Sequence, residues 1–346
     1  MKKKEYHGVV VPMVTPVTEE GRLDVAAVER IIRFFAQAGV SPLLMGTTGE
    51  GNSVSQNDGL LLVQTAVKAR EQCSMTIYAG LTGNCFAEQK AQAEAYIKAG
   101  ADVIVATLPT YYALTPEQME NYYLALADVV GEASKLCNQE QRIVGEASKL
   151  CHQKQRIVGE VSKLCNQMQQ QSLEASPTTV PLMLYNILAT THMSIPVDVI
   201  KRLADHPNIV GLKDSERDLE RMAQCIEITK THPDFAYFCG WAAQSAHSLE
   251  LGGNGIVPST GNFVPEMFQQ LFDAAVAGDM ETANRLQEET NEIAKIYQKD
   301  RTLGQSLTAL KVMMQTKGLC EPWMLMPLTR LSVFEERAIT LKAQAV

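Results

Sequence analysis

The feature that most constrains this chain is a regular alternation of short apolar, β-branched runs with longer amphipathic stretches. Eight of the apolar runs have the length of strands, and they fall at 8–14, 42–46, 75–80, 102–107, 181–185, 208–213, 235–239 and 255–258. A helical pattern follows each run, at 24–38, 55–71, 86–99, 116–130, 196–205, 218–231, 242–251 and 265–277. Eight strands, each followed by a helix, predict a (β/α)8 TIM barrel of the α/β class.

The end of the chain departs from this alternation. Three further helical patterns occur without a strand between them, at 280–298, 304–316 and 329–344. We therefore expect a barrel over residues 1–278 and a C-terminal helical domain over residues 279–346.

A repeat interrupts the predicted barrel after the fourth strand, over residues 130–172. Three near-identical units follow one another, at 130–143, 144–157 and 158–171. Their apolar positions recur every seven residues, which predicts a helical stripe. A single straight helix over all three units would run about 63 Å, whereas residues 169–179 span only about 38 Å when extended. We expect a helical hairpin that bends near Gly145 or Gly159 and lies away from the chemistry. The alternative is a partly disordered repeat expansion without function.

Composition narrows the class of function. Lys and Arg number 31 against 39 Asp and Glu, a net charge of −8, which disfavours nucleic acid and anionic membranes as partners. No apolar run is long enough to span a membrane, and polar residues follow the first lysines where a signal peptide would be apolar. The eight cysteines and six histidines show no metal-ligand spacing, so no metal is expected. These features favour a cytoplasmic enzyme that acts on a small molecule.

In such barrels the reacting groups stand at the carboxyl ends of the strands. Lys213 closes the apolar run 208–212. If it points into the barrel, burial lowers its pKa and leaves an amine able to form a Schiff base with a ketone. The alternative is a solvated lysine at a strand end. Tyr185 ends the strand 181–185 and is either a proton relay or a core tyrosine.

Two other strand ends carry polar side chains. The loop Gly46-Thr47-Thr48-Gly49-Glu50-Gly51 offers hydroxyl and amide groups that can hold a carboxylate without an arginine. It lacks the G-K-[ST] ending of a nucleotide-binding loop. Tyr111 and Tyr112 follow the fourth strand and supply either a second hydroxyl or packing.

Taken together, these strand ends resemble the pyruvate-dependent class I aldolase superfamily of N-acetylneuraminate lyase and dihydrodipicolinate synthase. The resemblance covers nearly the whole chain outside the repeat, and four segments carry it: 46–50, 111–112, 185–186 and 211–215. It implies a homodimer or homotetramer and chemistry that needs neither a metal nor an organic cofactor.

The resemblance also implies roles for the catalytic residues. Lys213 matches the Schiff-base lysine, and Tyr185 matches the phenol that moves protons at the imine. Thr47 matches the hydroxyl that bridges to a second tyrosine. Tyr112 matches that tyrosine, which in several members reaches across from a neighbouring subunit.

By the same resemblance, Thr48 holds the carboxylate of pyruvate, helped by backbone groups near Gly240 and Val257. Ser259, with Thr260 beside it, is similar to the Ser-Thr pair after the eighth strand of the lyases. The segment Lys213-Asp214-Ser215 is similar to that of 2-keto-3-deoxy sugar-acid aldolases and hydroxy-oxoglutarate aldolases.

Departures from the family pattern concern the second substrate. Thr190 falls where dihydrodipicolinate synthases carry an arginine, and Leu188 replaces a proline. Trp241 lies where sialic acid lyases have an acidic pair, and an apolar wall there would suit a less polar aldehyde. His192 is either a substrate contact or a loop residue.

We therefore expect a lyase that joins or cleaves pyruvate, or another 2-oxo acid, and an aldehyde, with 2-keto-3-deoxy sugar acids preferred. A dihydrodipicolinate synthase or related dehydratase is the first alternative, and an inactive aldolase-like sensor or scaffold is the second. A phosphosugar isomerase is disfavoured, because the loops after the seventh and eighth strands offer no lysine or arginine to a phosphate.

Overall fold

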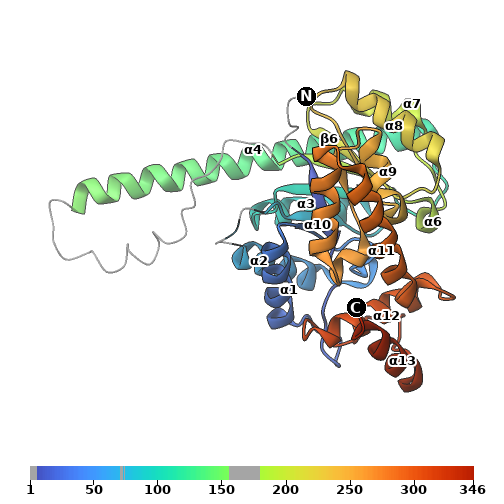
Figure 1. Ribbon diagram of the computed structural model, residues 1–346. Helices are drawn as coiled ribbons and strands as arrows, with labels where there is room; N and C mark the ends of the chain where they lie inside the picture. The colour runs from blue at the N-terminus through green and yellow to red at the C-terminus, as the bar shows by residue number, and fades with distance from the viewer. Residues whose placement is uncertain (1–5, 71–72, 74, 156–179) are drawn as a thin grey trace.

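The computed structural model describes residues 6–70, 73, 75–155 and 180–346, with side chains left undescribed from 140 to 155. Eight parallel strands close into a barrel in sequence order, which confirms the predicted TIM barrel (Figure 1). The strands are β1 Gly8–Pro12, β2 Ser41–Leu44, β3 Tyr78–Leu81, β4 Val103–Thr107, β5 Leu182–Asn186, β6 Ile209–Asp214, β7 Ala236–Cys239 and β8 Gly255–Ile256.

A helix follows every strand and covers the outside of the barrel. The principal helices are α1 Val25–Ala38, α2 Gln56–Ala69, α3 Phe86–Lys98, α4 Pro116–Gln155, α7 Val197–Leu203, α8 Leu219–Thr231, α9 Ser245–Glu250 and α10 Pro265–Ala277. A short helix, α6 (Leu188–Thr191), lies directly after β5. No helix in the described ranges has the length and hydropathy to cross a membrane.

The strands are buried on both faces, because one face meets the helices and the other fills the barrel. Along β5, Leu182 and Leu184 pack outward into the larger core, whereas Met183 and Tyr185 belong to a separate cluster inside the barrel. Side chains alternate between the two faces of a strand. This alternation decides which strand-end residues point into the barrel.

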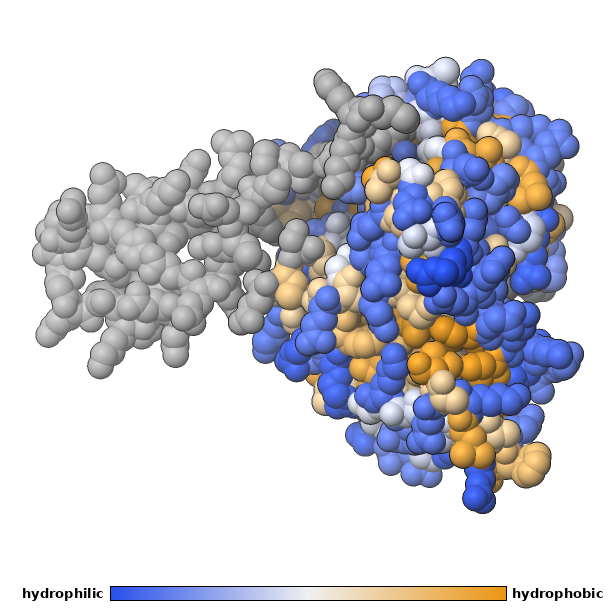
Figure 2. All heavy atoms as spheres, in the orientation of Figure 1, coloured by the Kyte–Doolittle hydropathy of each residue, from blue (hydrophilic) through white to orange (hydrophobic). Residues whose placement is uncertain are grey.

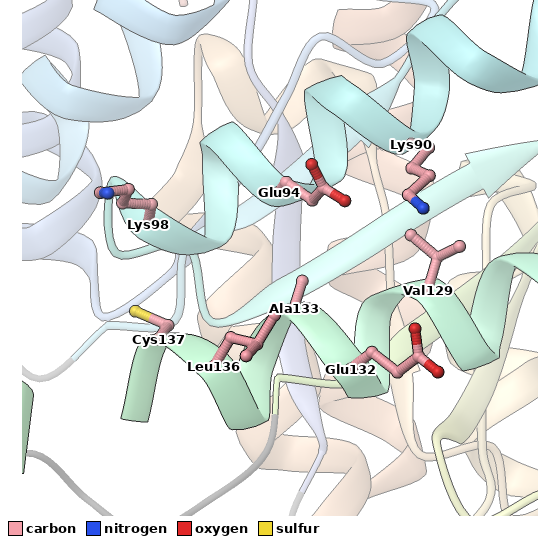
Figure 3. A pocket seen from close by; sticks show the side chains of 8 residues that line it. All are labelled: Lys90, Glu94, Lys98, Val129, Glu132, Ala133, Leu136 and Cys137. Atoms are coloured by element: carbon pink, nitrogen blue, oxygen red, sulfur yellow. The ribbon is translucent and has the colours of Figure 1, made fainter. Parts of the chain in front are cut away.

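The first repeat unit continues α4 and packs on the barrel. Val130 is fully buried, and Val180 N donates a hydrogen bond to Ser134 Oγ at 2.7 Å where the chain returns to the barrel. Figure 3 shows Ala133 and Cys137 of α4 facing α3 across a pocket, which contains none of the candidate catalytic residues.

Beyond this contact α4 extends away from the barrel as one helix (Figure 1). The helix continues through Gly145 to Gln155, so the bend predicted near Gly145 is wrong. The i to i−4 hydrogen-bond pattern tolerates a single glycine at a cost of only about 1 kcal/mol. The alternative bend near Gly159 lies outside the described residues.

The C-terminal helices form the predicted helical part, with bounds α11 Met280–Gln298, α12 Leu303–Thr316 and α13 Val333–Ala343. Helix α11 packs on α10, and α12 reaches the loop after β2. Several large apolar side chains are exposed on and near α13, including Val333, Phe334 and Leu341. Figure 2 shows hydrophobic residues gathered over this part of the molecule.

Candidate active site

Lys213 and Tyr185 lie side by side inside the barrel. They are paired in register on the neighbouring strands β5 and β6, so both project from the inner face at the same level. Lys213 is 3% exposed and Tyr185 is 5% exposed. The Nζ atom of Lys213 lies 3.6 Å from the centroid of the Tyr185 ring. Lys213 is therefore enclosed by the barrel, whereas a solvated strand-end lysine would be exposed.

Burial changes the chemistry of this amine. Removal from water penalises the ammonium form and lowers the pKa of Lys213, and the contact with Tyr185 opposes this shift only in part. A lowered pKa increases the fraction of neutral amine near neutral pH. The neutral amine is the form that attacks a carbonyl carbon.

Thr47 links the loop after β2 to this pair. Its Oγ1 lies 3.1 Å from Tyr185 Oη, and either atom can be the donor. Thr47 is half-buried, and Thr48 beside it is buried. Hydroxyl groups in contact can pass a proton from one to the next, so the contact between Thr47 and Tyr185 has the geometry that a proton relay beside Lys213 requires.

Tyr112 does not join this relay within one chain. It is 73% exposed, and its ring packs edge-on against Tyr111 with the centroids 4.9 Å apart. Asn84 holds the same loop by accepting from the backbone N–H groups of Thr110 and Tyr111. The structure therefore places Tyr112 on the surface at the mouth of the barrel.

The predicted substrate-binding positions occupy other loops of the mouth. Gly240 N donates to Asp214 O at 2.6 Å, and a Cβ on Gly240 would lie 2.2 Å from Ser215 Oγ, so only glycine fits. Val257 N donates to Cys239 O, so this amide already has a partner on β7 of the barrel. Neither N–H is therefore free to bind substrate.

The remaining positions differ in their surroundings. Ser259 Oγ is 2.8 Å from Tyr297 Oη, so its hydroxyl already has a protein partner. Thr190 is half-buried in α6, with its Oγ1 turned to the carbonyl of Ile187. His192 ends α6 with φ at 57° and is exposed. Trp241 is half-buried and packs against the core.

A buried polar network behind Lys213 was missed by sequence reasoning. Asp214 points outward from β6, where Arg221 Nε and Asn186 Nδ2 each donate to its carboxylate at 2.8 Å. Asn186 Nδ2 also donates to Glu216 Oε2 at 2.9 Å. Burial raises the pKa of Asp214, and the charge of Arg221 opposes the rise. The network fixes the end of β6 from behind and so orients Lys213.

The C-terminal helices also hold three loops of the mouth, which composition and periodicity did not predict. Gln287 on α11 makes hydrogen bonds to the backbone of Ala242 and Ala246 after β7. Tyr297, also on α11, makes hydrogen bonds to the hydroxyls of Ser259 and Thr260 after β8. Lys311 on α12 bonds Glu50 after β2. Lys311 lies inside the apolar stretch Leu310–Met314, and a charge in such a stretch indicates a buried lysine with a partner. This signal in the sequence could have predicted the contact.

Known proteins share both the sequence pattern and the fold. The model of the dihydrodipicolinate synthetase family matches residues 5–143 and 167–345, which leaves 144–166 of the repeat unmatched. The 4-hydroxy-tetrahydrodipicolinate synthase of Laribacter hongkongensis is 28% identical over 94% of this chain and 93% of its own. That of Methylococcus capsulatus is 26% identical over 96% of both.

Solved structures give the same result for the fold. Dihydrodipicolinate synthase of Bacteroides thetaiotaomicron superposes with a TM-score of 0.80 at 23% identity, over 99% of both chains. YagE of E. coli K12, solved in complex with pyruvate, superposes with a TM-score of 0.79 at 22% identity, over 99% of this chain and 98% of its own. The chain is a lyase that belongs to the dihydrodipicolinate synthetase family.

Proposed function

We propose that this protein is a class I lyase in which Lys213 forms an imine with pyruvate or another 2-oxo acid. The observation that carries the proposal is the buried Lys213 amine against the Tyr185 ring, with Thr47 bonded to the Tyr185 hydroxyl. Family membership supports it, and the YagE structure shows a protein of this fold with pyruvate bound.

The reaction follows from these groups. The neutral amine of Lys213 adds to the ketone carbon, and Tyr185 returns a proton to the oxygen as water leaves. The resulting protonated imine draws electrons from the neighbouring carbon. That carbon can then lose a proton, or an aldehyde by carbon–carbon cleavage, and becomes an enamine. Thr48 binds the carboxylate of the 2-oxo acid in this proposal.

The aldehyde is proposed to be uncharged. By the family resemblance, Thr190 falls where dihydrodipicolinate synthases carry an arginine, and Trp241 falls where sialic acid lyases have an acidic pair. Neither side chain carries a charge. Without a cation at either of these positions, nothing there compensates for burying a second carboxylate. Sugar-derived aldehydes are uncharged, so 2-keto-3-deoxy sugar acids, which release such an aldehyde together with pyruvate, are the preferred substrates.

Incubation with a panel of 2-keto-3-deoxy sugar acids tests this choice, with released pyruvate as the readout and Lys213→Met as the control. Release by the wild type alone supports the proposal. If no member of the panel is cleaved while pyruvate still forms the imine, the aldehyde assignment is wrong.

The second candidate is 4-hydroxy-tetrahydrodipicolinate synthase activity, favoured by the names of the curated relatives. It requires an amino aldehyde with its own carboxylate. Condensation of pyruvate with aspartate 4-semialdehyde, at a rate exceeding that with neutral aldehydes, would establish this candidate in place of the first.

We also propose a cytoplasmic homo-oligomer in which Tyr112 completes the relay of a neighbouring subunit. The 73% exposure of Tyr112 in a single chain supports this arrangement. Mixing the inactive variants Lys213→Met and Tyr112→Phe tests it, because each mixed pair regains one intact site. Recovered activity is expected, and a strictly monomeric protein that is fully active would overturn it. An inactive scaffold is disfavoured, because it has no need of a relay.

A further inference from the structure

A buried ion pair joins the C-terminal helices to the loop that carries Thr47 and Thr48. Lys311 Nζ lies 2.5 Å from Glu50 Oε1, and both side chains are fully buried. Backbone groups also bind each member of the pair. Lys311 Nζ donates to Trp323 O at 2.7 Å, and Leu325 N donates to Glu50 Oε2 at 2.8 Å. Glu50 is thus held from two segments of the C-terminal part.

The cost of this arrangement indicates a role other than stability. Removing two charges from water carries a desolvation penalty that the attraction between them repays only in part. Well-packed apolar residues would stabilise the same contact at least as well. A charged pair that is fully enclosed, with a backbone hydrogen bond to each member, offers a fixed geometry, which apolar packing does not.

The backbone of the loop shows what this geometry controls. Glu50 has φ at 55°, in the left-handed region that a residue with a side chain rarely adopts. Such a conformation persists only where the surroundings enforce it. Gly49 before it has no room for a Cβ, which would lie 2.7 Å from Met13 O. The loop closes on itself through bonds from the Gly49 and Gly51 N–H groups to Gly46 O.

Thr47 and Thr48 lie inside this closed turn, two or three residues from the Glu50 carboxylate. Thr47 reaches Tyr185 at 3.1 Å, a distance that a small rotation of the turn would lengthen beyond a hydrogen bond. The Glu50 carboxylate anchors this turn to the C-terminal part through Lys311 and Leu325.

We propose that Glu50 and Lys311 are a positioning pair, through which the C-terminal helices hold Thr47 against Tyr185 and Thr48 at the carboxylate of the 2-oxo acid. The inference rests on the proposed function for the identity of that substrate. Neither residue contacts substrate, and their effect passes through the turn. The C-terminal part is thereby a component of the active site although it contributes no catalytic residue.

The test compares Lys311→Met and Glu50→Gln with a matched control, Lys317→Met. Lys317 lies directly after α12, and its Nζ donates to Phe263 O at 2.7 Å, so it also ties the C-terminal part to the barrel but not to the turn. Glu50→Gln keeps an acceptor for Leu325 N and guards against simple failure to fold. Two readouts are measured: amide hydrogen exchange of residues 46–51, and exchange of pyruvate methyl protons into deuterium oxide.

Both Lys311→Met and Glu50→Gln should speed amide exchange in 46–51 at least tenfold and slow the pyruvate exchange at least tenfold. Lys317→Met should change each rate by less than about twofold. At saturating pyruvate, where the contact of Thr48 with the carboxylate no longer limits the rate, Lys311→Met should slow pyruvate exchange little further in a Tyr185→Phe background, because the relay through Thr47 is already lost.

Equal effects of Lys311→Met and Lys317→Met would overturn the proposal, as would unchanged amide exchange in 46–51. An undiminished effect of Lys311→Met in the Tyr185→Phe background would also contradict it. Wild-type protein that exchanges no pyruvate protons would refute the proposed function alone, because the amide exchange still decides whether the pair holds the turn.

Discussion

Replacing Tyr185 by phenylalanine should remove proton transfer at the imine and leave the fold intact. The change deletes one hydroxyl, whose protein partner is Thr47 Oγ1 at 3.1 Å, and keeps the ring that lies against Lys213. Loss of one general acid–base group costs about 10²–10⁴ in rate, which corresponds to roughly 3–5 kcal/mol of the barrier. Thr47 is half-buried, so loss of this hydrogen bond costs about 0.5–1.5 kcal/mol of stability.

The assay is the exchange of pyruvate methyl protons into deuterium oxide, followed by NMR, because the enamine is reprotonated from solvent and no aldehyde is needed. Thr47→Val removes the other hydroxyl of the relay and is the partner in a double-mutant cycle. If the two hydroxyls act as one unit, the double variant should be no slower than about the slower single variant. Fully additive losses, or a Tyr185→Phe protein as fast as wild type, would refute the reasoning.

Three other changes test the surroundings of the site. Arg221→Met should lower the free energy of unfolding by about 3–5 kcal/mol, since it leaves Asp214 charged and buried. The control Lys230→Ala removes an exposed pair with Glu227 and should cost less than about 1 kcal/mol. Equal losses in urea unfolding would contradict this prediction. Lys213→Met should be more stable than wild type at neutral pH. The pKa of Lys213 is lowered in the folded state, so the unfolded chain binds more protons. The stability of the wild type should therefore rise relative to that of the variant as the pH approaches 10. If the free energies of unfolding of the two proteins depend on pH in parallel, the amine is not desolvated. Deleting residues 144–166, which the family model leaves unmatched, should not change pyruvate exchange; a tenfold loss would place the repeat in the chemistry.

The barrel could be predicted from the sequence because its strands are buried on both faces and therefore read as continuous apolar runs. The position of Lys213 followed from the same pattern, since a charge that closes such a run lies at the carboxyl end of a strand. The strand ends also indicated Tyr185 and the loop that carries Thr47, whereas a relay role for Thr47 came only from the family resemblance.

The contacts that hold these residues could not be predicted in the same way. Lys311 and Glu50 are 261 residues apart, and no local pattern joins them. Arg221 lies on α8 among other charged residues, and only the folded arrangement, in which α8 packs on β7 and α7, brings it to Asp214. The bend expected at Gly145 was wrong because a single glycine does not interrupt a helix on its own.

The central claim is that Lys213 forms a covalent imine with a 2-oxo acid, and borohydride trapping tests it most directly. Wild-type protein is reduced in the presence of pyruvate, weighed intact and mapped by peptide mass, with Lys213→Met treated in parallel. The account predicts one pyruvate adduct per chain, located on Lys213 and absent from the variant. No adduct, or adducts spread over surface lysines in both proteins, would contradict it.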